Sequence, residues 1–237
     1  MIYHFDTLPS TNDEARKPHY AGGDVVVADF QTEGRGQRGN KWSSQAGQNL
    51  MFSVVVQPRA LRASHQFVLL ESVALALVDA FALWGIDTTV KWTNDIYVGD
   101  CKMVGVLIEN SLSGGVVARS VVGIGINVNQ TQFDASLPNP TSMALVCGRE
   151  FSLSEVLESV CRALARRLDA LNEGCDEEIH NEYCRRMYRL GVESTFELPD
   201  GSRFRGTIRD VERGGALIID TADGERRFLF KEVAFVL

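Results

Sequence analysis

The stretch TTVKWTNDIYVGDCKMVGVLIENSLSGGVVARSVVGIGINVN, residues 88–129, decides the fold class because it is a series of apolar runs broken by short turns. Gly-Asp at 99–100 and Ser-Gly-Gly at 113–115 have the composition of hairpin turns, which join neighbouring antiparallel strands. The pattern therefore predicts a mainly antiparallel sheet with strands at 88–92, 95–99, 103–109 and 116–129.

The segments outside this stretch place the helices in separate blocks. A continuous apolar pattern over 64–84 predicts a long buried helix that ends at Gly85. Ser152 and Glu155 form a capping box in front of apolar residues at helical spacing. Blocks of helices beside hairpin strands are typical of an α+β fold with a mixed, mainly antiparallel sheet, and not of a doubly wound parallel sheet. Further elements are expected as strands at 2–8, 24–30 and 49–58, a short helix after a Thr11–Glu14 capping box, and a helix over 175–189.

The character of the chain changes after Gly191. Short alternating strands are cut there by Asp-Gly and Gly-Gly turns, which is typical of a small β-barrel of roughly 45 residues. We expect a catalytic domain at 1–189 and a small barrel domain at 190–237. Because barrels of this size rarely stand alone, the second domain should pack on the first.

The composition is that of an ordinary globular protein with an acidic balance. Of the 237 residues, 45% are hydrophobic and 23% charged, and the formal net charge is −7. Negative charge opposes non-specific binding of DNA or of an anionic membrane. No apolar stretch reaches the roughly 18 uncharged residues of a membrane span, and the N-terminus lacks a signal-peptide pattern. We therefore expect a cytoplasmic protein without a DNA or membrane partner.

The cysteines and histidines show no pattern of ligands. The five cysteines are an odd number without a C-x-x-C pair, and the four histidines are scattered. We interpret the cysteines as free thiols in a reducing compartment, and we expect no metal ion held by protein side chains.

Four segments carry polar residues or glycines that a plain strand or loop does not need. Ser-Thr-Asn at 10–12 begins a helix, and a simple cap is the plainer interpretation. The loop QTEGRGQRGNKW at 31–42 combines glycines with Arg35 and Arg38 and ends on Trp42. It has the chemistry of a clamp for phosphate or carboxylate, while a solvated turn and an RNA-binding strip are the alternatives.

The other two segments lie within the predicted sheet. In residues 91–109, charged and amide side chains alternate with apolar ones, and a structural ion pair between Lys91 and Asp95 is the alternative to a functional role. In GIGIN, 123–127, glycines at alternate positions leave one face of a strand bare, as a flat ligand would require. A positive, glycine-floored pocket without a nucleophile triad suits adenylation of a carboxylate, which needs charge neutralisation and alignment more than a strong base.

In this order, the motifs STN, QTEGRGQRGNKW, KWTNDIYV, KMVGVLIE and GIGINVN make the chain resemble the biotin protein ligases over about its first 130 residues. The resemblance implies a catalytic fold like that of class II synthetases and biotin ligases, and the C-terminal strands are similar to the family's SH3-like barrel. It also implies biotin and Mg·ATP as substrates, biotinyl-5′-AMP as intermediate, and a lysine of a biotin carboxyl carrier protein as acceptor. The motif STN begins so near the first residue that we expect no DNA-binding domain before it, and a homodimer is left open.

The resemblance also assigns roles to residues. Lys102, Arg35 and Asp95 become the catalytic set: Arg35 and Lys102 hold carboxylate and phosphate oxygens. Asp95 orients or deprotonates the incoming lysine, unless it simply pairs with Lys91 or Lys102. Biotin-binding residues are expected to be Ser10, Thr11, Asn12, Gln31, Gly34, Arg35, Gly36, Gln37, Lys102, Gly105, Gly123 and Gly125. Residues for ATP and the adenylate are expected to be Arg35, Gln37, Arg38, Trp42, Asn94, Lys102 and Asn127, with Trp42 packed over the adenine.

Two positions depart from the family pattern. Thr93 stands where members usually have proline, and we expect little effect beyond a slightly looser turn. Gln37 stands where many members have arginine, so one charge-assisted hydrogen bond to the adenylate, worth about 1.5–3 kcal/mol, is missing unless Arg38 or Lys41 compensates. Our hypothesis is that the adenylate is held less tightly here than in a relative with arginine at this position. The rival interpretations are a lipoate-type protein ligase and a catalytically silent nucleotide- or RNA-binding module.

Overall fold

The computed structural model describes residues 1–236, with the backbone alone for Arg38. Its larger sheet is mixed and mainly antiparallel, as the sequence predicts. The seven strands lie in the order β1-β2-β3-β7-β6-β5-β4, and β1 and β2 are the parallel pair. They are β1 (Ile2–Leu8), β2 (Val25–Gln31), β3 (Leu50–Val56), β4 (Thr89–Lys91), β5 (Asp95–Val98), β6 (Cys101–Ser113) and β7 (Val116–Ile126).

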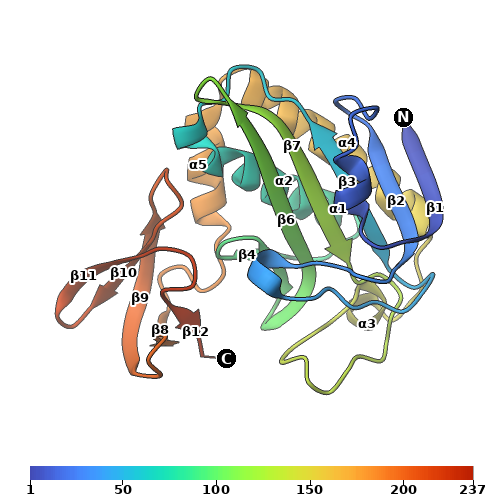
Figure 1. Ribbon diagram of the computed structural model, residues 1–237. Coiled ribbons are helices and arrows are strands. Elements are labelled where there is room, and N and C mark those ends of the chain that lie inside the picture. The colour runs from blue at the N-terminus through green and yellow to red at the C-terminus, as the bar shows by residue number, and fades with distance from the viewer. Residues whose placement is uncertain (237) are drawn as a thin grey trace.

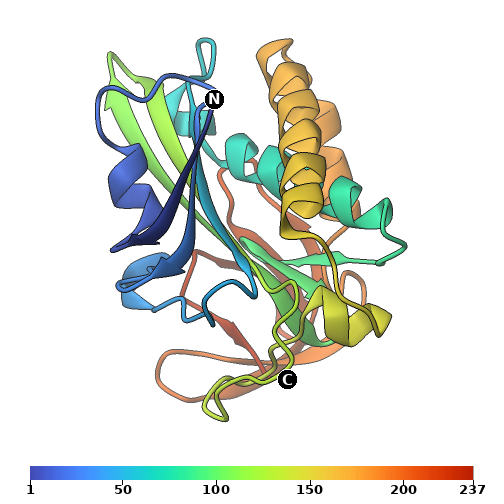
Figure 2. The same ribbon diagram turned by 90° about the vertical axis from the view of Figure 1, so that its right-hand side faces the viewer.

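The longer helices cover one face of this sheet, and the short first helix lies on the other (Figure 2). The covering helices are α2 (Phe67–Ala82), α4 (Leu153–Asn172) and α5 (Asp176–Arg185). The opposite face carries α1 (Thr11–Ala15), which packs on β2, β3 and β7. The short elements η1 (Gln37–Gly39), η2 (Ala63–His65) and α3 (Met143–Cys147) lie in the connecting segments.

Burial of α2 organises the core. Nearly every side chain of this helix is buried, because α4 and α5 pack on it and the sheet lies beneath. A charged bridge ties the three helices together: Arg167 on α4 contacts Asp79 on α2 at 2.8 Å and Glu182 on α5 at 2.7 Å. Paired and partly buried charges of this kind fix the packing of helices whose other contacts are non-directional.

A second, antiparallel sheet follows at the C-terminus and lies beside the larger one (Figure 1). Its order is β11-β10-β9-β8-β12, with its own buried residues such as Phe196, Ile208 and Leu217. This five-stranded sheet agrees with the expected SH3-like barrel. Its strands are β8 (Glu193–Glu197), β9 (Arg203–Val211), β10 (Leu217–Thr221), β11 (Gly224–Phe228) and β12 (Ala234–Phe235).

The structure corrects the expected helix over 175–189. Helix α5 ends at Arg185, because the next residues pair with the edge strand β4 instead of continuing the helix. The amide of Val90 donates to the carbonyl of Arg186 at 2.8 Å, and the amide of Tyr188 donates to the carbonyl of Val90 at 2.9 Å. Backbone pairing with β4 thus competes successfully with the last helical turn.

The expected capping box at Thr11 is also wrong, whereas the second one is partly confirmed. Ser10 is the N-cap of α1 and makes no side-chain capping bond, and Thr11 is already the first helical residue. At α4 the hydroxyl of Ser152 accepts from the amide of Glu155, as predicted. Among the residues described, no helix is long and apolar enough to cross a membrane.

Candidate active site

A cavity of about 540 Å³ opens on the α1 face of the larger sheet. Residues from all four sequence segments meet in its wall, although they lie far apart along the chain. The predicted site residues that line it are Ser10, Thr11, Asn12, Gln31, Arg35, Gly36, Gln37, Trp42, Asn94, Asp95, Lys102, Gly105, Gly123 and Gly125. The convergence follows from topology, because β6 and β7 form one long hairpin and α1 lies across β7 and β3.

Three predicted residues are not in this wall. Gly34 lines a neighbouring cavity of about 770 Å³ on the other side of the 31–42 loop. Asn127 is buried, and its side-chain amide donates to the carbonyl of Thr141 at 3.0 Å, so this side chain holds the segment after β7 in place. The side chain of Arg38 lies outside the part of the chain that the structure describes.

The Ser-Thr-Asn segment forms a buried polar network at the start of α1. Gln31 accepts at Oε1 from the amide of Thr11 at 2.7 Å and from its hydroxyl at 3.1 Å. The hydroxyl of Ser53, in the middle of β3, lies 2.8 Å from Thr11 Oγ1 and 2.6 Å from Asn12 Oδ1. Because buried polar groups are costly unless paired, this network fixes the side of the cavity nearest α1.

The 31–42 loop closes on itself as a narrow hairpin. The amide of Trp42 donates to the carbonyl of Gly34 at 2.9 Å, and the amide of Gly36 donates to the carbonyl of Asn40 at 2.7 Å. A Cβ on Gly34 would lie 2.3 Å from the carbonyl oxygen of Trp42. Only glycine fits this close approach of two backbone segments, so the glycine is needed for the shape of the loop.

The loop places the indole of Trp42 on the glycine floor. A Cβ on Gly125 would lie 2.4 Å from Cε2 of Trp42, and one on Gly105 would lie 2.9 Å from Cζ3. The third floor glycine, Gly123, is covered by Asn12, whose Oδ1 would lie 2.2 Å from an added Cβ. The bare strand faces predicted from the sequence are therefore present, and side chains of the same molecule occupy them.

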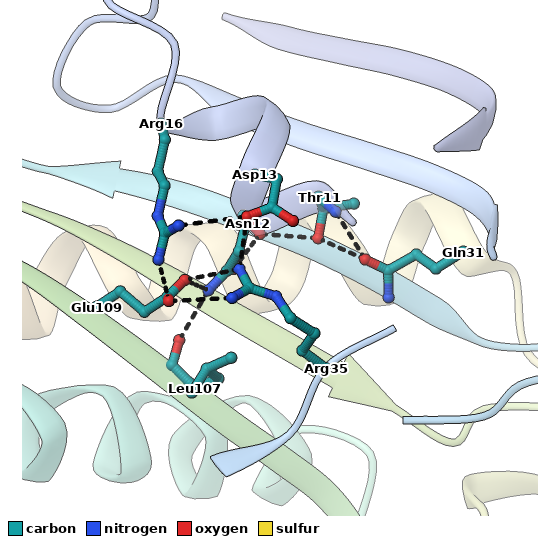
Figure 3. A network of polar contacts seen from close by, with 9 residues as sticks. Thr11, Asn12, Asp13, Arg16, Gln31, Arg35, Leu107 and Glu109 are labelled. Atoms are coloured by element: carbon teal, nitrogen blue, oxygen red, sulfur yellow. Dashed lines mark hydrogen bonds and ion pairs between the residues drawn. The ribbon is translucent and has the colours of Figure 1, made fainter. Parts of the chain in front are cut away.

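Arg35 points into a cluster of charges beside the floor (Figure 3). Its guanidinium lies 2.7 Å from a carboxylate oxygen of Asp13 and 3.1 Å from one of Glu109. Arg16 also pairs with Glu109, and the side-chain amide of Asn12 donates to the same carboxylate at 2.8 Å. The carboxylates of Asp13 and Glu109 thus pair with the guanidinium of Arg35, for which the sequence predicts binding of an anionic ligand.

Lys102 and Asp95 form an ion pair within the cavity, with 2.7 Å between Nζ and the carboxylate. Both remain partly exposed, at 34% and 24% of their side chains, so a ligand can reach them. Lys91, the other candidate partner of Asp95, donates instead to the hydroxyl of Tyr97 at 2.9 Å. Burial lowers the pKa of Lys91, while the nearby Asp95 acts in the opposite direction.

The C-terminal segment supplies a wall that the sequence did not predict. Residues 230–231 and 233–235 line the cavity opposite α1. The ring of Phe230 meets Trp92 at 6.1 Å between centroids, and Lys91 lies 5.3 Å above the ring of Phe235. The indole N–H of Trp92 donates to the carbonyl of Gly215 at 3.0 Å, which ties the two sheets together behind this wall.

The comparisons with known proteins agree with this geometry. The family model described as the biotin/lipoate A/B protein ligase family matches residues 4–127. A biotin–[acetyl-CoA-carboxylase] ligase of Paracoccus denitrificans is 32% identical over 95% of this chain and 97% of its own length. The chain belongs to the biotin/lipoate A/B protein ligase family.

Other relatives of this biotin/lipoate ligase family member extend the likeness over the whole chain. The bifunctional ligase/repressor BirA of Bacillus subtilis is 29% identical over 98% of this chain and 73% of its own length. The biotin protein ligase of Aquifex aeolicus, solved in complex with biotin and ATP, superimposes with a TM-score of 0.84. It is 27% identical, and the match covers 99% of this chain and 98% of that structure.

Two residues of this ligase-family site escaped the sequence analysis although each left a signal. Ser53 interrupts the apolar run of β3, and a lone hydroxyl in a fully buried strand requires a hydrogen-bond partner. Glu109 ends the motif KMVGVLIE, but its contact with Arg35 depends on how the loop folds over β6. Asn94 lies in the cavity wall as expected, and its amide also donates to the carbonyl of Val106.

Proposed function

We propose that this family member is an ATP-dependent biotin protein ligase that acts through the cavity between α1, the 31–42 loop and the C-terminal segment. The observation that carries the proposal is the meeting of a glycine floor with basic side chains, among them Arg35 and Lys102, in a single cavity. A flat, apolar ring system fits against bare strand backbone, while the basic residues suit a carboxylate and a phosphate placed side by side.

In the first step, a carboxylate oxygen of biotin forms a bond to the α-phosphorus of ATP. The bond from this phosphorus to the oxygen that bridges to the β-phosphate breaks, and pyrophosphate leaves with the electron pair. Lys102 and Arg35 lower the barrier by neutralising charge on the two reacting anions and aligning them. Mg²⁺ enters with the phosphates of ATP as part of the substrate, since Asp95 is the one carboxylate among the described residues of this wall.

In the second step, the ε-amine of a carrier lysine forms a bond to the acyl carbon of biotinyl-5′-AMP, and AMP leaves. A free lysine is about 99.9% protonated at neutral pH, so the amine must lose a proton before it attacks. Asp95 lies in the cavity wall and pairs with Lys102. We assign it the role of orienting the amine and accepting its proton, while the same ion pair keeps Lys102 in place.

Substrate binding requires two contacts to be exchanged. The indole of Trp42 must leave Gly105 and Gly125, and we propose that it then packs over the adenine of the nucleotide. Arg35 must turn from Asp13 and Glu109 to the ligand, whose carboxylate or phosphate has the same chemistry as the groups it replaces. The contacts that Trp42 and Arg35 make in the structure cover the apolar and positive groups of the loop, and the ligands would take over this role.

The remaining predicted site residues take supporting roles in this proposal. The network of Ser10, Thr11, Asn12 and Gln31 offers hydrogen bonds to the polar ring of biotin, and Gly34 and Gly36 shape the loop. Gln37 and Asn94 line the cavity and are assigned to contacts with the adenylate, and Arg38 keeps the adenylate-binding role that the family resemblance implies. Because Asn127 is committed to Thr141, we assign it to positioning the segment after β7 instead of direct contact with the nucleotide.

The acceptor in this proposal is a biotin carboxyl carrier protein, and neither DNA nor a membrane is a partner. The net charge of −7 opposes binding to polyanions. The five cysteines form no disulfide, which suits the reducing cytoplasm that we propose as the compartment.

The decisive experiment incubates the full chain with biotin, Mg·ATP and a carrier domain and follows the carrier by mass spectrometry. We expect one biotin on the carrier lysine, dependent on ATP. Lipoate in place of biotin is the matched control, because the family includes lipoate ligases. If the carrier stays unmodified with biotin but gains lipoate, lipoate replaces biotin as the substrate. If neither group is transferred, the proposal is overturned.

A further inference from the structure

A second group of reactive side chains lies outside the cavity wall, where α5 meets the C-terminal sheet. His180 and Cys184 are one helical turn apart on α5, and Asp210 stands on β9. The ring Nε2 of His180 lies 3.8 Å from Sγ of Cys184. The nitrogen, sulfur and carboxylate donors of the three residues all lie within 4.8 Å of one another.

A buried carboxylate orients the histidine of this group. Glu71 on α2 is 1% exposed, and its Oε1 lies 2.6 Å from Nδ1 of His180. With Nδ1 committed to Glu71, Nε2 is the nitrogen that faces Cys184 and Asp210. Metal-binding histidines usually have this arrangement, in which a carboxylate holds the far nitrogen and increases the basicity of the near one.

We propose that His180, Cys184 and Asp210 bind one zinc ion, with Glu71 supporting the histidine from behind. Thiolate, imidazole and carboxylate are the three ligand types that zinc takes in proteins. Donors around a tetrahedral zinc ion lie roughly 3.5 Å apart, so small shifts of the exposed Asp210 side chain close the set. Water can take the fourth position, because Asp210 is exposed.

The local charge suits a divalent cation. A thiolate at Cys184 and the carboxylates of Asp210 and Glu71 outweigh the guanidinium of Arg213, which lines a small cavity together with Glu71 and His180. Because zinc binds the thiolate form of cysteine, its binding at Cys184 would release a proton.

The ion would join two parts of the fold. His180 and Cys184 belong to the helical layer, whereas Asp210 belongs to the sheet whose terminal segment walls the cavity. From the sequence we expected no metal ion held by protein side chains, because the four histidines are scattered and the cysteines form no C-x-x-C pair. The third ligand is supplied by a strand that only the fold brings near.

The test adds Zn²⁺ or Co²⁺ to the chelator-treated full chain and needs no assumption about its catalytic activity. We expect one equivalent of zinc to bind and to raise the melting temperature, and Co²⁺ to give a thiolate-to-metal charge-transfer band. Cys184→Ser and Asp210→Asn should each weaken binding at least about ten-fold, since even supporting residues change metal affinity by that much. The cobalt band should be absent in Cys184→Ser.

Cys175→Ser is the matched control, because this cysteine precedes the same helix at its N-cap, where serine is a favoured residue. It should bind zinc like the wild type. In the wild type the backbone amide of Val211 donates to a carboxylate oxygen of Asp210 at 2.8 Å, and Asp210→Asn retains a side-chain oxygen that can accept this bond. No stoichiometric zinc in the wild type, or unchanged affinity in both ligand variants, would overturn the proposal.

Discussion

Replacing Trp42 by alanine tests whether the indole competes with biotin for the glycine floor. In the structure the ring lies directly on Gly105 and Gly125, where the proposed ring system of biotin has to fit. Removing it should leave the floor open, so biotin no longer has to displace a side chain of the protein. We expect Trp42→Ala to bind biotin more tightly in the absence of ATP.

The size of the effect follows from the contacts of the ring. A covered tryptophan buries roughly 150–250 Å² of surface, which at about 25 cal/mol per Å² stabilises the closed loop by about 4–6 kcal/mol. Against this, the indole N–H is buried without a partner among the described residues, which costs about 1–3 kcal/mol. Ordering of the loop costs a further 1–2 kcal/mol or so. At the middle of these ranges about 1.5 kcal/mol remains, so biotin should bind roughly ten-fold more tightly.

Isothermal titration calorimetry with biotin alone measures this change. Trp42→Phe is the control, because it keeps a flat ring on the floor while removing the N–H without a partner. Titration with ATP should move in the opposite direction for Trp42→Ala, since loss of one stacking contact with a base costs about 1–3 kcal/mol. Biotin affinity that is unchanged or weaker in Trp42→Ala would refute the competition between indole and biotin.

Three further predictions concern catalysis, retention of the intermediate and stability. Lys102→Ala should slow pyrophosphate release about 10²–10³-fold, because one donor to the reacting anions is lost; a loss below ten-fold would contradict its role. Gln37→Arg should slow release of the adenylate about ten- to a hundred-fold in a dilution assay, and equal off-rates would remove the hypothesis. Arg167→Met should lower the free energy of unfolding by about 1–3 kcal/mol at pH 7, because its partners Asp79 and Glu182 lose their bridge. Arg167 holds the pKa of Glu182 below its ordinary 4.5, so this stabilisation is complete above that value and is lost as the pH falls through the lowered pKa. Urea unfolding of the two proteins should therefore converge between about pH 5 and pH 3, and a constant difference down to pH 3 would contradict the linkage.

Local patterns predicted the secondary structure where one interaction dominates. Apolar alternation and the turns at 99–100 and 113–115 indicated the hairpins of the larger sheet, since strand pairing there follows directly from chain order. The prediction failed where two partners compete for the same backbone or side chain. Residues 186–188 pair with β4 instead of extending α5, and Thr11 bonds with Gln31 and Ser53 instead of capping α1.

The sequence alone determined the α+β class, the second sheet and the residue types of the cavity, because hydrophobic period, turn chemistry and ordered motifs are local properties of the chain. It also indicated that the strands around Gly105 and Gly125 have a bare face. Tertiary structure decided what lies on that face, which acids hold Arg35, and how the C-terminal segment and the His180 cluster are completed. Those contacts join residues that are distant in sequence, and their distances follow from how loops and layers pack, which no local pattern encodes.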